Sequence, residues 1–106
     1  MIDTHSIHLI AKAARDKFGE NGPHQIISRL TEEIGEIAAD VNAREGSLAK
    51  REKAESGEML HKEIVDAMRA LFDLVDYYDL ELELNESVKE SLQKWVDDGY
   101  INQGDV

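Results

Sequence analysis

The chain has 106 residues and a mass of 12.0 kDa, which predicts one domain covering residues 1–106. Its 23 acidic and 12 basic residues give a formal charge of −11. This charge argues against binding to nucleic-acid polymers or to anionic membranes, which need a positive surface, but it permits divalent cations and phosphates bound to them. The chain contains no cysteine, which excludes disulfides and thiolate zinc sites. Because it has neither a secretory leader pattern nor a long apolar run, we expect a cytoplasmic protein.

Apolar residues recur at helical spacing along almost the whole chain, which predicts an all-α fold of four helices. The predicted helices cover Thr4–Phe18, Pro23–Ala43, Glu58–Asp79 and a segment from about Asn85 to Gly99. Asp3 or Thr4 is expected to cap the first helix and Asn85 the fourth. We expect loops in the charged stretch 44–58 and in the alternating segment 80–84, and a loose tail after residue 99.

Each predicted helix carries an apolar stripe that should face a core. The stripe of the first helix consists of Ile7, Ile10, Ala14 and Phe18, and that of the second consists of Ile26, Ile27, Leu30, Ile34, Ile37, Ala38 and Val41. The stripe of the third helix consists of Leu60, Ile64, Ala67, Leu71, Leu74, Val75 and Tyr78, and that of the fourth consists of Leu84, Val88, Leu92 and Trp95 or Val96. Four short helices make a thin core, so we expect a homodimer that buries the remaining apolar surface.

Acidic residues are placed alike on the second and third predicted helices. On a wheel of ~100° per residue with Glu33 at zero, Glu36 falls at about −60° and Asp40 at about −20°, while the apolar stripe centres near ~70°. Glu63 and Asp66 repeat the pattern on the third helix. If the two helices pack antiparallel, both acid pairs meet at one edge of their interface. Oxygen ligands of this kind suit Mg²⁺, Mn²⁺ or Ca²⁺. The alternative is a solvated acidic face, the usual role of a single E-x-x-E pair.

These residues also resemble a known family. The segment LTEEIGEIAADV (30–41), followed by KEIVDAMRALFDLVDYYDLELE (62–83), is similar to the MazG-type all-α nucleoside triphosphate pyrophosphohydrolases. The family motif is E-E-x-x-E, a variable spacer and E-x-x-D, which here corresponds to Glu32, Glu33 and Glu36, a spacer of 26 residues, and Glu63 and Asp66. The match covers about half of the chain.

The resemblance implies a four-helix MazG-type bundle that forms a homodimer or a dimer of dimers. It implies a hydrolase that uses Mg²⁺, with Mn²⁺ as a substitute, to convert a nucleoside triphosphate to the monophosphate and pyrophosphate. By motif position, Glu33, Glu36, Glu63 and Asp66 would be the metal ligands. Glu32 matches the leading acid of the motif, but it points toward solvent on the wheel and its role stays open.

Several other residues are candidates for contact with a substrate. Lys50, Arg51 and Lys53, in the stretch between the acidic helices, either fold over the phosphates or belong to a solvated loop. His24, at the start of the second helix, either reaches the base or is an exposed turn residue.

Two candidates lie on the third predicted helix. Arg69 either holds a phosphate or neutralises Asp66 or Asp73. Asp73 either contacts a sugar or cation or is a surface acid. Many relatives carry an aromatic residue four positions after the last motif acid, where this chain has Ala70.

Three functions remain open from the sequence. The first is a pyrophosphohydrolase that acts on canonical or modified nucleotides in house-cleaning of the nucleotide pool. The second is a non-catalytic helical module that binds a cation, a nucleotide or a basic partner. The third is a degenerate family member that senses nucleotides; intact acids at all four ligand positions favour the first function over this one.

Overall fold

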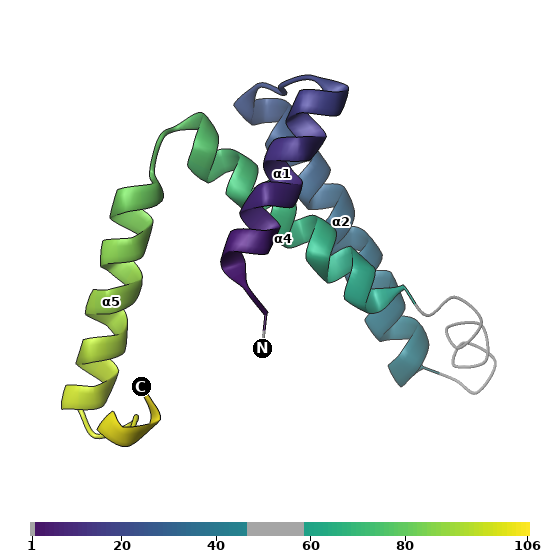
Figure 1. The fold of residues 1–106 in the computed structure, drawn as a ribbon. Coiled ribbons are helices and arrows are strands. Elements are labelled where there is room, and N and C mark those ends of the chain that lie inside the picture. Colours follow the sequence, from purple (N-terminus) through teal and green to yellow (C-terminus); the bar gives the residue numbers. More distant parts are fainter. Residues whose placement is uncertain (1, 47–58) are drawn as a thin grey trace. The chain divides into compact units, whose positions relative to one another are not determined.

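The computed structural model describes residues 2–46 and 59–106, and these residues form four α-helices and one short 3₁₀ helix (Figure 1). The α-helices are α1 (Thr4–Phe18), α2 (Pro23–Glu45), α4 (Leu60–Tyr77) and α5 (Glu81–Asp97), and the 3₁₀ helix η1 covers Gln103–Asp105. No β-strand occurs in these two ranges, which confirms the all-α class. Residues 47–58, most of the predicted connection, lie outside the described residues.

Contacts between Cα atoms divide the chain into two compact units, residues 1–74 and 75–106. The first unit holds α1, α2 and most of α4, and therefore all of the predicted metal ligands. The second unit holds the end of α4, together with α5 and η1.

The ends of α1 and the start of α2 follow from local side-chain chemistry. Asp3 caps α1, because its Oδ1 accepts a hydrogen bond from the backbone N–H of His5 at 3.0 Å. Gly19 ends α1 with a φ of 90°, a conformation that glycine adopts without steric cost. Pro23 is the first residue of α2, where its missing N–H breaks no helical hydrogen bond. These boundaries confirm the predicted ones.

The core of the first unit is small and is built where α1 crosses α2 and α4 (Figure 1). Its buried apolar residues are Ile7, Ala11, Ile26, Ala67 and Ala70. The ring of His8 also packs on that of Phe72 of α4 in an edge-to-face arrangement, with 6.0 Å between the ring centroids. Three of the buried side chains are alanines, which let the helices approach closely but bury little apolar area.

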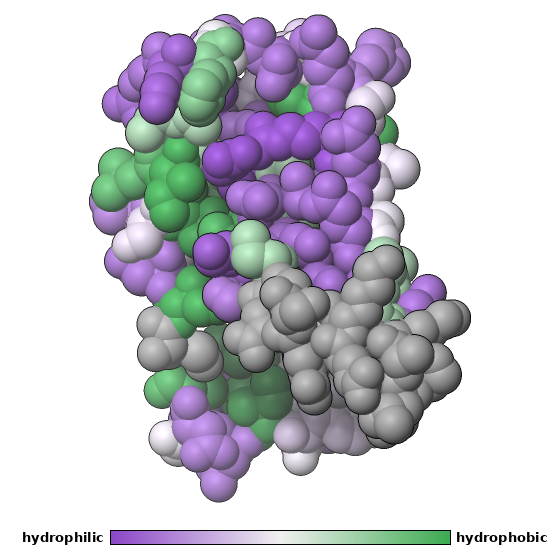
Figure 2. Space-filling view, turned by 90° about the vertical axis from the view of Figure 1, so that its right-hand side faces the viewer, coloured by the Kyte–Doolittle hydropathy of each residue, from purple (hydrophilic) through white to green (hydrophobic). Residues whose placement is uncertain are grey.

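Much of the predicted apolar stripe is therefore exposed, which corrects the expected core. Phe18 is 77% exposed and Ile34 is 53% exposed, and Ile10 and Leu71 are also open to solvent. Figure 2 shows hydrophobic side chains at the surface beside a mainly hydrophilic face. The physical reason is that each of the three helices is covered on one side only. Part of each apolar stripe therefore extends beyond the contact between the helices and stays exposed.

The second unit differs from the prediction at the start of α5, whereas the predicted ending at Gly99 is confirmed, since this glycine follows the C-cap residue Asp98 with a φ of 84°. The helix begins at Glu81 after the N-cap residue Leu80, so Asn85 lies inside it and caps nothing. The alternating segment LELEL is helical because leucine and glutamate are both strong helix formers. Asp79, with a φ of 53°, precedes this start and separates it from α4.

The tail after Gly99 is ordered by local contacts, not loose as predicted. The edge of the Tyr100 ring packs on Trp95, with 5.3 Å between the centroids. Asn102 caps η1, because its Oδ1 accepts from the backbone N–H of Gly104 at 3.0 Å. None of the helices in the described ranges is both long and apolar enough to cross a bilayer.

Candidate metal centre

Helices α2 and α4 run antiparallel, which is the arrangement in which the sequence predicts that the acids converge (Figure 1). Residues near the start of α2 lie opposite residues near the end of α4, and residues near the end of α2 lie opposite residues near the start of α4. The interacting pairs are Arg29 with Asp73, Glu33 with Asp66, and Asp40 with Glu63.

Two of the four predicted ligands, Glu33 and Glu63, lie close enough to the other acids for their pKa values to be raised. The negative charges of Glu36 and Asp66 both act on Glu33, and those of Glu36 and Glu33 both act on Glu63. Glu33, Glu63 and Asp66 are partly buried, whereas Glu36 is exposed. The structure thus brings two carboxylates from each helix to one edge of the α2–α4 pair.

Three carboxylate oxygens in this region are buried and have no hydrogen-bond partner. They are Oε2 of Glu33, Oδ2 of Asp40 and Oε2 of Glu63. A buried acceptor without a donor is costly, and more so when it carries charge. A cation at this edge would supply the interaction that the protein itself does not.

Glu63 holds its proton much more tightly than a free glutamate. Its pKa is raised from 4.5 to about 7, first by a side-chain hydrogen bond with Asp40, then by burial, and then by the charges of Asp40, Glu36 and Glu33. Glu63 therefore keeps its proton to a higher pH than an ordinary glutamate when no cation is bound.

Burial is the main cause that raises the pKa of Glu33, and the charges of Glu36 and Asp66 add to it. A hydrogen bond with Glu36 acts in the same direction, while the positive charge of Arg29 opposes it. The main cause differs between the two carboxyl groups, but burial and the negative charge of neighbouring acids raise the pKa of both.

The donor set fits Mg²⁺ or Mn²⁺ in type, because both ions prefer carboxylate oxygens. The side chains are not yet arranged around an ion: within residues 2–46 and 59–106, no group of three or more acidic or histidine side chains could hold one as it stands. Repulsion among the carboxylates favours such a spread arrangement. Binding would need rotation of these side chains toward a common point.

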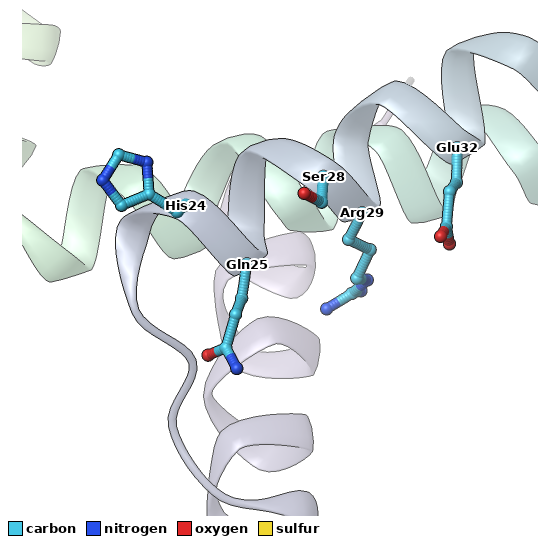
Figure 3. A pocket seen from close by; sticks show the side chains of 5 residues that line it. All are labelled: His24, Gln25, Ser28, Arg29 and Glu32. Carbon is cyan, nitrogen blue, oxygen red and sulfur yellow. The ribbon is translucent and has the colours of Figure 1, made fainter.

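Glu32 lies on the outer side of α2, as the helical wheel predicts, and it is exposed. It lines a surface pocket of about 380 Å³ together with His24, Gln25, Ser28 and Arg29 (Figure 3). His24 is exposed near the start of α2, and its predicted contact with a base stays a prediction. The pocket gives both residues a common location beside the acidic edge.

Asp73 is not the surface acid that the sequence allowed, since only 4% of it is exposed. Its Oδ1 accepts from Nη1 of Arg15 at 2.7 Å, and its Oδ2 accepts from Nη1 of Arg29 at 3.4 Å. The carboxylate thus joins α1, α2 and α4. With both oxygens bound to arginines, Asp73 has a structural role that the sequence did not predict.

The other candidates on and near α4 have different positions. Arg69 is partly buried, and its Nε has no hydrogen-bond partner, so its contact with a phosphate stays a prediction. Ala70 is completely buried and therefore cannot take the place of the aromatic residue in many relatives. Lys50, Arg51 and Lys53 lie outside the described residues.

Two residues of the site were missed by the sequence analysis. Asp40 lies outside the family motif, but on the helical wheel it lies on the same flank as Glu33. This position was the signal that could have placed Asp40 in the site. Arg29 precedes Glu33 by one helical turn, a spacing that favours contact between opposite charges. Its contact with Asp73, 44 residues away, had no signal in the sequence.

Comparison with known protein families gives no match to a family model. Comparison with solved structures gives no match either. The chain is 37% identical over 67 residues to the uncharacterized protein YpjD of Bacillus subtilis (strain 168), an alignment that covers 63% of the chain and 60% of YpjD. The chain thus spans less than two thirds of that protein, whose name states no activity.

Proposed function

We propose that the chain is a Mg²⁺-dependent nucleoside triphosphate pyrophosphohydrolase of the MazG type, with Mn²⁺ able to replace Mg²⁺. It would cleave the bond between the α- and β-phosphates of a (d)NTP with water and release the (d)NMP and pyrophosphate. One observation carries the proposal. The acid pairs of two antiparallel helices meet at one edge, at the positions of the family motif, and carry buried oxygens without partners.

In this proposal Glu33, Glu36, Glu63 and Asp66 hold the metal. A bound Mg²⁺ ion would neutralise phosphate charge and acidify a water molecule. The carboxylates themselves would orient that water, while the partial burial of Glu33, Glu63 and Asp66 would limit the access of other water molecules. No side chain needs to act as a nucleophile, which agrees with a chain that has no cysteine.

A homodimer belongs to the same proposal. The described residues leave large apolar side chains open to solvent on every α-helix, including Phe18, Ile34, Leu71 and Trp95. No residue of α5 is buried. A second copy of the chain would cover part of this surface and thicken a core that one copy builds largely from alanine. The enzyme would act on nucleotide pools in the cytoplasm.

The alternative is a non-catalytic helical module in which the same acids bind a cation, a nucleotide or a basic partner. The absence of an assembled ligand set within residues 2–46 and 59–106 is the observation that favours it. The two functions differ in what the loss of one acid changes. In a module, Asp66→Asn would change binding or assembly. In an enzyme it would abolish turnover and leave assembly intact.

The experiment is therefore a comparison of the wild-type protein with Asp66→Asn. Pyrophosphate release from a mixture of (d)NTPs would be measured with Mg²⁺ and with EDTA, and the oligomeric state would be measured by light scattering. The proposal predicts metal-dependent release by the wild type, none by the variant, and the same mass for both. Equal release by both proteins would reject the site.

A further inference from the structure

Arg29 has one bound nitrogen and one buried nitrogen without a partner. Its Nη1 donates to Oδ2 of Asp73 at 3.4 Å, whereas its Nη2 is shielded from solvent and has no hydrogen-bond partner. A buried donor left unpaired is costly, and a charged one more so. The partly exposed guanidinium therefore has hydrogen-bonding capacity left for an acceptor that comes from outside the chain.

The guanidinium of Arg29 is held in place from behind. Asp73, to which it donates, is almost fully buried and also accepts from Arg15 at 2.7 Å. Asp73 therefore anchors the guanidinium groups of two arginines at one point of the fold. Such a fixed and planar guanidinium is preorganised for a phosphate, because less side-chain freedom is lost on binding.

The positive charge of Arg29 also reaches the candidate metal centre. Arg29 lies one helical turn before Glu33 and lowers the pKa of that carboxyl against the effect of burial. Arg29 therefore stands between a buried structural carboxylate on one side and the acidic edge of α2 and α4 on the other.

The pocket lined by Arg29 has donors at one end and an acid at the other. Figure 3 shows Gln25, Arg29 and Glu32 on one side of α2, with Ser28 beside them and His24 at the end. The Oε1 of Gln25 accepts from the backbone N–H of Gly22 at 2.9 Å, which leaves the amide nitrogen of Gln25 as a donor.

The order of these groups along the helix gives the pocket a direction. From His24 to Glu32 the helix rises by about 12 Å, and Glu32 adjoins Glu33. A metal-bound triphosphate has matching polarity, because its free oxygens need donors while its cation needs carboxylates. The volume of about 380 Å³ lies in the range of small-molecule pockets.

We propose that Arg29 is a phosphate-binding residue, which uses its guanidinium group to hold an oxygen of the metal-bound triphosphate in the pocket of Figure 3. Ser28 and the Gln25 amide provide further donors, and Asp73 and Arg15 are positioning residues that fix the guanidinium. This inference rests on the proposed function and extends it to the phosphate side of the site.

The test compares three variants that each make the formal charge more negative by one. Arg29→Gln removes the guanidinium, and Ser28→Asp puts a carboxylate into the pocket from an exposed position. Arg44→Gln is the matched control, because Arg44 is an exposed arginine in the last turn of the same helix. Titration calorimetry would measure the binding of Mg²⁺-tripolyphosphate, and a separate titration would measure the binding of Mn²⁺ alone.

The substitutions should affect the affinities for the two ligands differently. Arg29→Gln and Ser28→Asp should each weaken Mg²⁺-tripolyphosphate binding by about tenfold or more, the usual effect of losing a charge-assisted hydrogen bond. Both should leave Mn²⁺ binding unchanged or tighter, because a more negative surrounding favours a free cation. Arg44→Gln should change neither by more than about twofold, as expected for an exposed charge.

A purely structural role for Arg29 gives a different result, namely a lower melting temperature with unchanged affinity in the folded protein. If Arg29→Gln does not fold, Ser28→Asp decides the question. Unchanged tripolyphosphate affinity in the folded variants would overturn the inference and leave the proposed function standing. An equal loss in Arg44→Gln would also overturn it, because net charge would then be the cause. No binding of either ligand by the wild type would overturn both proposals together.

Discussion

Glu63 on α4 and Asp40 on α2 lie close enough for their carboxyl groups to form a hydrogen bond when Glu63 is protonated, and this bond is the main reason why the pKa of Glu63 is raised to about 7. Two carboxyl groups can bond only when one of them carries a proton. Without a cation, and at a pH below about 7, a proton therefore links the two helices that bear the candidate metal centre. A metal ion would replace that proton, so proton and cation compete for the same edge of the helix pair.

The first prediction concerns stability without metal. The folded-state pKa of Glu63, about 7, lies above its ordinary value of 4.5, so the folded state binds this proton more tightly than the unfolded state. The stabilising contribution of Glu63 is complete below about pH 4.5 and is lost as the pH rises through about 7. Thermal unfolding in EDTA should show wild type losing more stability over this window than Glu63→Gln. A wild type and variant with parallel pH profiles would contradict the shared proton.

The second prediction concerns the effect of metal over the same window. Because Glu63 must lose its proton to bind a cation, the rise in melting temperature caused by Mg²⁺ or Mn²⁺ should be larger near pH 8 than near pH 5. Differential scanning fluorimetry with and without the metal measures this rise directly. A shift that is the same at both pH values would place the cation elsewhere on the protein.

The third prediction separates catalysis from stability at Glu36. This exposed residue adds negative charge to both Glu33 and Glu63. Glu36→Gln should therefore raise the melting temperature of the metal-free protein, because it relieves repulsion. It should also reduce turnover by roughly 100-fold or more, since even groups behind the metal ligands typically cost 10- to 100-fold. Glu45→Gln, an exposed glutamate at the end of the same helix, is the control. A variant that keeps its activity would remove Glu36 from the site.

The fold could be predicted from the sequence where a local signal decides the structure. Asp3 and Gly19 bound α1 as expected, because a cap and a left-handed turn depend on residues next to them. The start of α5 was misplaced at Asn85, because a good capping residue also tolerates a position inside a helix. The helical strength of the preceding Leu and Glu residues was the better guide.

The candidate site could be predicted only in part, for a related reason. The motif spacing and the helical wheel place Glu33, Glu36, Glu63 and Asp66 on flanks that meet in an antiparallel pair. The burial of Asp73 depends on Arg15, which is 58 residues away, and no periodic pattern carries that information. Contacts between distant residues were therefore where the sequence analysis failed.

The fourth prediction tests the role of Asp73 as the link between three helices. Asp73→Asn removes the negative charge that pairs with both Arg15 and Arg29. The loss of one member of a buried ion pair destabilises a fold strongly, but the two arginines here are partly exposed. We therefore expect the free energy of unfolding to fall by about 2–4 kcal/mol. Asp16→Asn changes an exposed acid on α1 and should cost less than about 0.5 kcal/mol. Urea unfolding would compare them. Equal and small losses would show that the buried carboxylate does not hold the helices together.

The fifth prediction concerns the position where many MazG-type relatives carry an aromatic residue. Ala70 is completely buried, so Ala70→Tyr should overpack the core and destabilise the protein by about 1–3 kcal/mol. Leu71→Tyr is the neighbouring control, because Leu71 is about half exposed and can accept a larger ring. Chemical denaturation measures both changes. A stable Ala70→Tyr protein would mean that this part of α4 is packed less closely than the structure shows.

A pyrophosphate-release assay on the purified wild-type protein would test the proposed activity itself. It would use Mg²⁺ or Mn²⁺ and a panel of (d)NTPs that includes dUTP, dCTP and oxidised purines, with EDTA as the metal-free control. The account predicts release of pyrophosphate and the matching monophosphate from one or a few of these nucleotides, and none in EDTA. No release from any nucleotide, together with no thermal stabilisation by either metal, would contradict the account and leave the acidic edge of α2 and α4 as a solvated face.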